Sequence, residues 1–138
     1  MATGPLLQHN APWPQRHGYR GDRYPDNIDY LQGVQFVSLA NNSLVEVSAR
    51  SGIALAYCQE LHLQHNQITE LPVSFKNLDR CEYLDISHNY MKAIPEEIGD
   101  MESLVVLDLR NNLLSTLPLS LAEIPALEQL FLQATNMS

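Results

Sequence analysis

Two aspartates stand at a spacing that could support acid–base chemistry. Asp85 and Asp108 occupy the same place in two similar stretches of the chain, and each lies between apolar neighbours in an alternating pattern. If the two stretches are adjacent parallel strands, their side chains lie about 5 Å apart on one face. Such a pair works as general acid and base only where a pocket desolvates one carboxylate. An open sheet offers little enclosure, so we predict no catalytic site and no enzyme.

Three histidines raise the possibility of a metal site. His62 and His65 are close together in one stretch, and His88 follows His65 at the interval that separates the two aspartates. His62 and His65 leave the chain in different directions, and the pair His65 and His88 lacks a third ligand, which makes a weak site. We therefore predict solvent-facing histidines, no metal site and no cofactor.

The only two cysteines, Cys58 and Cys81, are separated by the same interval again. Both occupy the first position of a repeated pattern, where the side chain points inward. In-register pairs on parallel strands fit disulfide geometry poorly. We interpret both as small buried hydrophobes.

The shared interval belongs to a repeat that positions all these groups. In the copy that begins at Leu104, apolar residues fall at positions 1, 4, 6, 11 and 14, Asn112 at position 9 and Pro118 at position 15. The pattern recurs in register from Cys58 and Cys81, and with small departures from Val34 and Leu127. No single copy can bury its apolar edge alone, so the copies must stack around a shared core.

The pattern resembles a leucine-rich repeat, L-x-x-L-x-L-x-x-N-x-L-x-x-L-P. Its second half, as in residues 95–101, resembles the 23-residue class found in intracellular Ras-binding and polarity scaffolds. The resemblance implies an α/β solenoid, a right-handed superhelix with about five short parallel strands on its concave face and short helical or irregular turns on its convex face. We expect Pro72, Pro95 and Pro118 to begin the convex passages, and the first passage, with Ser48 and Gly52, to be irregular.

The pattern divides the chain into two parts. Residues 1–23 are predicted to be a flexible, proline-containing arm, whose Trp13 either docks elsewhere or covers the first coil. Residues 24–138 are predicted to be the repeat domain, with a half-repeat at 24–33, repeats that start at 34, 58, 81, 104 and 127, and the last repeat incomplete. Such an ending indicates either a shortened array or a last strand that is covered by something else.

The net charge of −8 lies entirely on the repeats. Residues 1–33 carry three basic and three acidic side chains, whereas residues 34–138 carry five basic and thirteen acidic ones. An acidic solenoid repels phosphates, which argues against nucleic acid and anionic membranes as partners. No apolar run is long enough to span a bilayer, and the N-terminus lacks the pattern of a secretory signal, so we expect a cytoplasmic protein.

The outward strand positions form the surface that we predict to bind a partner. Acidic groups framed by aromatic rings suit a protein ligand that presents Lys or Arg. The predicted contact residues are Phe36, Glu60, His62, Tyr83, Asp85, Val106, Asp108, Arg110 and Phe131.

Two functions are consistent with this surface. The first is a non-catalytic protein–protein interaction module in signalling or scaffolding, for which the resemblance implies a small GTPase or another signalling protein as the partner. The second is a structural subunit, or the N-terminal piece of a longer array, packed in a larger assembly. A binding module with a covered C-terminal edge should be monomeric, whereas a severed array should self-associate through the strand that contains Phe131.

Overall fold

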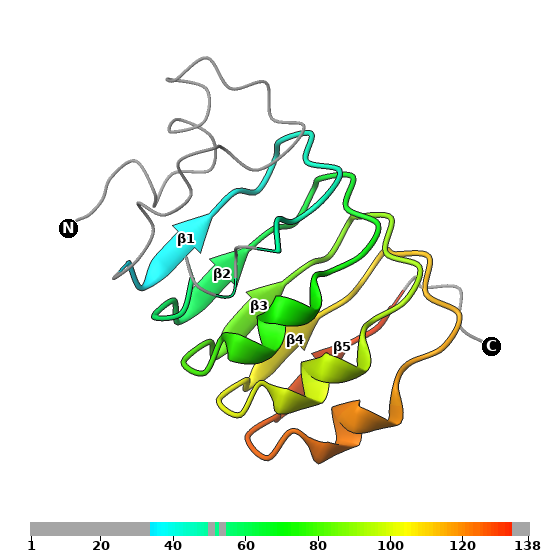
Figure 1. Cartoon of the computed structure of the whole chain (residues 1–138). Helices are drawn as coiled ribbons and strands as arrows, with labels where there is room; N and C mark the ends of the chain where they lie inside the picture. Colours follow the sequence, from blue (N-terminus) through cyan, green and yellow to red (C-terminus); the bar gives the residue numbers. More distant parts are fainter. Residues whose placement is uncertain (1–33, 50–51, 53–54, 134–138) are drawn as a thin grey trace.

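The computed structural model describes residues 34–49, 52 and 55–133. Its strands form one parallel sheet in sequence order (Figure 1). Each strand is short, and one convex passage separates it from the next. The strands are β1 (Phe36–Ser38), β2 (Glu60–His62), β3 (Tyr83–Asp85), β4 (Val106–Asp108) and β5 (Gln129–Phe131).

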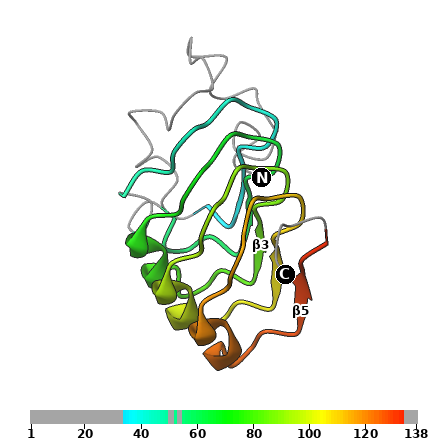
Figure 2. The ribbon, with the colours of Figure 1, turned by 90° about the vertical axis from the view of Figure 1, so that its right-hand side faces the viewer.

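Short 3-10 helices lie on the opposite side of the core from the sheet (Figure 2). They are η2 (Val73–Asn77), η3 (Glu96–Asp100) and η4 (Leu119–Glu123). A proline in extended conformation precedes each helix: Pro72, Pro95 or Pro118. Its carbonyl accepts a hydrogen bond from the third residue of the helix, and its missing N–H leaves no donor unsatisfied at the helix start. The predicted short helical turns are confirmed.

The core fills the space between the strands and the 3-10 helices. The middle residues of β2, β3 and β4, which are Leu61, Leu84 and Leu107, pair in register and are fully buried. Phe75 and Ile98 close the core from the convex side. Because a fully buried leucine contributes about 1.5–3 kcal/mol, these rows stabilise the stacking of one coil on the next.

An asparagine column connects the coils at the turns that follow the strands. The amide nitrogen of Asn89 donates to the carbonyl oxygens of Ile86 in its own coil (3.1 Å) and Leu63 in the preceding coil (3.0 Å), and its Oδ1 accepts from the Ile68 N–H (3.0 Å). Satisfying these buried backbone groups is worth about 1 kcal/mol per bond. Equivalent bonds are made by Asn66 and Asn112.

The residue before each asparagine of the turns has a left-handed backbone. The φ angles are 61° at Asn41, 61° at His65, 57° at His88 and 60° at Asn111. Asparagine and histidine are enriched in this conformation among non-glycine residues. His65 and His88 are thus turn residues by their place in the repeat.

These observations confirm the predicted α/β solenoid, with five parallel strands on its concave face. Both cysteines are free and buried, as predicted. The arm, the half-repeat at 24–33 and part of the first convex passage lie outside the described residues, so those predictions stand as predictions.

Candidate partner-binding face

The predicted contact residues lie together on the outer face of the sheet. Register places Phe36, Glu60, Tyr83 and Val106 in one row across β1 to β4. Two residues further along the strands, a second row across β2 to β5 contains His62, Asp85, Asp108 and Phe131. Arg110 follows Asp108 by two residues and therefore projects from the same face.

Three rings form a continuous stack over the first three strands, which we call the aromatic ladder: Phe36, His62 and Tyr83. The ring centroids of Phe36 and His62 are 5.0 Å apart, and those of His62 and Tyr83 are 5.1 Å apart. All three side chains are half-buried. Tilted rings at this separation attract one another, so the ladder is a preorganised apolar platform. Glu60 Oε1 lies 3.3 Å from His62 Nε2 and places a carboxylate at the ladder.

Asp85 is almost fully buried, with 8% of its surface exposed. Its Oδ1 accepts hydrogen bonds from the backbone N–H of Ser87 (2.9 Å) and from the Ser87 hydroxyl (2.7 Å). One oxygen of this carboxylate is therefore used inside the chain, to hold the end of β3.

Asp108 is buried more deeply, with 2% of its surface exposed. Its Oδ1 accepts from the Arg110 backbone N–H (3.1 Å) and Nε (2.9 Å), and its Oδ2 accepts from Nη2 (2.6 Å). The Arg110 guanidinium also lies over the ring of Phe131, with 5.2 Å between Cζ and the ring centroid. We call Asp108, Arg110 and Phe131 the arginine clamp.

The surroundings of two ionisable groups on this face raise their pKa values. The hydrogen bonds and negative charge of Asp108 raise the pKa of the Arg110 guanidinium. Burial raises the pKa of the Tyr83 phenol, and the negative charges of Asp85 and Asp108 add to this effect. Arg110 therefore stays cationic and Tyr83 neutral across the physiological range.

The clamp changes what the face offers to a partner. The two aspartates were expected to supply exposed acidity, but strand alternation puts the residue two positions later on the same face. Ser87 and Arg110 occupy those positions. Ser87 donates hydrogen bonds to one oxygen of Asp85, and Arg110 donates to both oxygens of Asp108. The acidity that remains accessible in the two rows is that of Glu60, whose side chain is 51% exposed. The spacings Asp-x-Ser and Asp-x-Arg carried this signal in the sequence.

His65, His88 and the two cysteines lie apart from this face. The rings of His65 and His88 stack with centroids 4.3 Å apart, and His88 Nε2 lies 3.2 Å from Asn111 Nδ2. No group of three or more His, Cys, Asp or Glu suited to a metal occurs among residues 34–49, 52 and 55–133. Burial raises the pKa of the Cys58 thiol to about 12 and that of the Cys81 thiol still further, which leaves both as unreactive core residues.

The fold defines a solenoid repeat protein with an extended parallel sheet on one face. Family models described as leucine rich repeat match residues 32–91 and 103–124. The chain belongs to the leucine-rich repeat family, whose members generally mediate protein–protein interaction and are typically non-catalytic.

Two solved structures are similar to this chain. A leucine-rich repeat protein of Leptospira interrogans, LIC12759, is 30% identical, with a TM-score of 0.68 over 87% of this chain. The leucine-rich repeat domain of the type III effector XCV3220 (XopL) is 21% identical, with a TM-score of 0.59 over 82% of this chain, and shows the fold alone. The chain spans 36% and 48% of the lengths of these two proteins. None of the curated proteins compared with the chain matches it.

A membrane-spanning helix is not part of the described structure. Within the described residues, no helix has both the length and the apolar character needed to cross a bilayer.

Proposed function

We propose that the chain is a non-catalytic interaction module that binds a protein partner through its concave sheet face, in cytoplasmic signalling or scaffolding. The observation that carries the proposal is the aromatic ladder of Phe36, His62 and Tyr83 beside the arginine clamp. Aromatic side chains and arginine are the residues that most often dominate binding energy at protein interfaces.

The ladder and clamp favour a partner with mixed charge. Glu60 at the ladder attracts a basic side chain, which can also stack on Tyr83 or His62. At the opposite end of the face, Arg110 is held in place by Asp108, and 43% of its side chain is exposed. Arg110 can therefore donate hydrogen bonds to a carboxylate of the partner. Preorganisation of both ends lowers the entropy cost of binding. The resemblance to Ras-binding scaffolds suggests a small GTPase or another signalling protein as the partner.

Site-specific photo-crosslinking tests this proposal. A photoreactive phenylalanine analogue at Tyr83 should capture a partner from the native cell extract, and a His62→Ala substitution in the same chain should weaken that capture at least about tenfold, as expected for a buried interface residue. The matched control carries the same analogue at Leu119, which is 87% exposed on η4. If both positions capture the same proteins, or if His62→Ala changes nothing, the concave face is not the binding surface. Purified small GTPases loaded with GDP or GTP then test the partner class.

A second function, a coil array packed in a larger assembly, rests on the C-terminal end of the core. A hollow of about 390 Å³ opens there, lined by apolar side chains. Leu127 and Leu130 are only partly buried, at the edge that a further coil would cover. The residues that line the hollow are Leu117, Pro118, Leu119, Leu121, Ala122, Leu127 and Leu130.

Light scattering of the purified chain distinguishes the two functions. A monomer at micromolar concentration supports the interaction module. Self-association that Leu130→Glu abolishes and Val73→Glu does not would support the packed array, because Leu130 lies on the edge strand, whereas Val73 is 55% exposed on η2 and does not line the hollow.

A further inference from the structure

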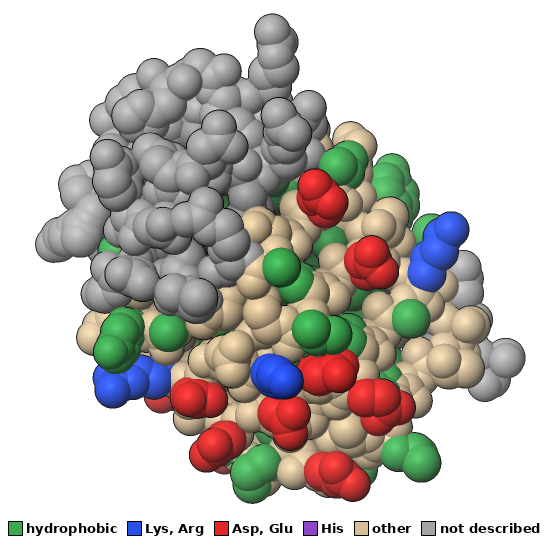
Figure 3. All heavy atoms as spheres, in the orientation of Figure 1, with side chains coloured by type: hydrophobic (Ala, Val, Ile, Leu, Met, Phe, Trp, Pro, Cys, Tyr) green, Lys and Arg blue, Asp and Glu red, His purple; other side chains and the backbone are tan. Residues whose placement is uncertain are grey.

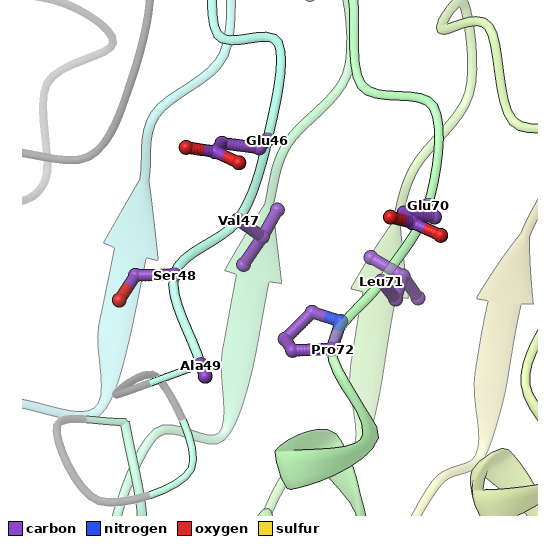
Figure 4. A pocket seen from close by; sticks show the side chains of 7 residues that line it. All are labelled: Glu46, Val47, Ser48, Ala49, Glu70, Leu71 and Pro72. Atoms are coloured by element: carbon purple, nitrogen blue, oxygen red, sulfur yellow. The ribbon is translucent and has the colours of Figure 1, made fainter.

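A second hollow lies on the convex side, between the first and second coils (Figure 4). Its volume is about 400 Å³. Ser48 and Ala49 stand on one side of it and Leu71 and Pro72 on the other, while the carboxylates of Glu46 and Glu70 lie toward the end nearer the asparagine turns. Val47 completes the lining. The hollow is separate from the concave face, because the core lies between them.

The hollow exists because the first coil departs from the repeat at this point. Coils two to four have Pro72, Pro95 and Pro118 at the fifteenth position, followed by a larger residue. The first coil has Ser48 and then Ala49. These smaller side chains fill less space beside Pro72, so the two coils leave a gap where later coils carry a proline.

The paired carboxylates are also confined to this junction. Glu46 and Glu70 hold the thirteenth position of the first two coils, whereas the third and fourth coils have Ala93 and Thr116 there. Both glutamates are exposed, and neither makes an ion pair with any residue of the described ranges. Two like charges on adjacent coils make the local potential strongly negative.

The floor of the hollow is apolar and well packed. Val47 is 7% exposed and Leu71 is 5% exposed, and Pro72 adds an apolar ring. The hollow therefore combines an apolar floor with two anionic side chains at one end. An anionic ligand would be repelled, and a purely apolar ligand would desolvate the carboxylates without compensation.

We propose that this hollow binds a lysine or arginine side chain of a partner protein. These side chains place an aliphatic stem on apolar surface and keep the charged head in a polar environment. The stem would lie on Val47, Leu71 and Pro72, and the cationic head between Glu46 and Glu70. Arginine fits best, because its guanidinium can donate to both carboxylates at once.

The charge of the chain indicates that the cation comes from a partner protein. Of the basic side chains in the described residues, Arg80 lies over Tyr57 and Arg110 is bound to Asp108. Lys76 and Lys92 do not line the hollow. The repeats as a whole are strongly acidic, so a partner that docks on this side needs basic surface to be attracted.

An NMR titration of the full chain tests the proposal. The probes are N-acetyl-arginine methylamide and N-acetyl-lysine methylamide, with N-acetyl-glutamine methylamide as the uncharged control. We expect the amide signals of Ser48, Ala49 and Leu71 to shift and saturate with a Kd of about 1–10 mM, as suits a ligand of this size. The glutamine probe should leave these signals in place.

Two double variants separate the site from general acidity. Glu46→Gln with Glu70→Gln should weaken binding of the arginine probe about five- to tenfold, because two exposed ion pairs are lost. Glu96→Gln with Glu97→Gln removes the same charge from η3 and should change the Kd less than twofold, because those acids do not line the hollow.

Four outcomes overturn the proposal. They are the absence of saturable shifts, equal weakening by both double variants, equal shifts with calcium chloride, and binding that appears only after Arg23→Gln and Arg50→Gln. The third outcome indicates a bare cation site that does not use the apolar floor. The fourth indicates that an arginine of this chain, outside the described residues, already occupies the hollow. The crosslinking test of the concave face is independent of all four.

Discussion

The acidic residues of the concave face and those of the convex hollow differ in what they can do. Asp85 and Asp108 are buried and bonded within their own coils, to Ser87 and Arg110. Glu46 and Glu70 also stand at matching positions of successive coils but are exposed. The net charge of −8 therefore does not by itself show which surface of the protein presents accessible acidic groups. Further acidic side chains gather on the convex side, over the 3-10 helices (Figure 3).

The physical reason for the difference is backbone geometry. In a strand, the side chain two residues later lies on the same face, so a serine or arginine there can reach the carboxylate. Glu46 and Glu70 lie in the convex passages, where the following residues, Val47 and Leu71, turn into the core. Within the described residues neither carboxylate makes an ion pair, and both are exposed, so they remain available to solvent or a ligand.

The largest expected effect is at Asp108. Asp108→Ala should lower the free energy of unfolding by about 2–3 kcal/mol, because a buried acceptor of three hydrogen bonds is lost. Chemical denaturation measures this value. Glu70→Ala is the control and should change the value by less than about 0.5 kcal/mol. Equal losses in both variants would remove the distinction between the two regions.

The buried thiol of Cys58 is a third kind of acidic group, and it has no cationic partner among the described residues. The stability of the protein at alkaline pH tests its burial. The folded pKa of Cys58 is raised to about 12 by burial, whereas an unfolded thiol titrates near a pKa of about 8.5–9. The unfolded state therefore loses its proton first as the pH rises. The contribution of this thiol to stability is unchanged below about pH 8.5 and falls from there toward pH 12, by about 1.5–2 kcal/mol at pH 10.

The measurement compares denaturation of wild type and Cys58→Ala at pH 8 and pH 10. The variant should start less stable, because it leaves a small cavity, but should lose less stability over the interval. An identical pH dependence in both proteins would mean that Cys58 is accessible to hydroxide in the folded state.

Asp85→Asn should lower the free energy of unfolding less than Asp108→Ala does, and less than ionisation of Cys58 at pH 10. The asparagine Oδ1 can still accept the two hydrogen bonds from Ser87, so we expect a loss of less than about 1 kcal/mol. Asp85→Ala, which removes the acceptor, should cost about 1–2 kcal/mol. Thermal unfolding of the two variants side by side gives the order. If the asparagine variant is the less stable one, the charge and not the hydrogen bonds holds the end of β3.

The smallest effect is expected in the convex hollow. Glu46→Gln with Glu70→Gln should leave stability unchanged or raise it by less than about 0.5 kcal/mol, because repulsion between exposed like charges is weak. Thermal unfolding at low and at high salt measures it, and any gain should shrink as salt increases. A loss above about 1 kcal/mol would show that these glutamates have structural partners.

The fold was predictable from the sequence to within a few residues. Each strand lies where the alternating positions of the repeat place it, and the prolines at the fifteenth position precede the 3-10 helices. This is possible because a linear repeat satisfies its hydrophobic and hydrogen-bonding requirements between neighbouring coils. Asn66, Asn89 and Asn112, which share the ninth position of successive repeats, form a column for the same reason.

The candidate site was predictable only as a set of positions. The repeat placed Phe36, His62 and Tyr83 on one face, and the structure shows in addition that their rings stack. The spacings Asp-x-Ser and Asp-x-Arg indicated bonding partners for Asp85 and Asp108, but the exposed fraction of each side chain was not predictable, because it depends on the packing around it. The burial of Asp85 and Asp108 and the exposure of Glu60 are properties of the packed sheet.

By itself, therefore, the sequence determined the winding of the chain: the regular step of the repeat, the inward and outward faces, the polar column at the turns and the acidic character of the repeats. Only the tertiary structure decided how deeply Asp85 and Asp108 are buried, that Arg110 lies over Phe131, and that a hollow opens beside Ser48 and Ala49. The reason is that periodic burial follows from local alternation, whereas charge pairing and free volume depend on distances of a few ångströms between neighbouring coils.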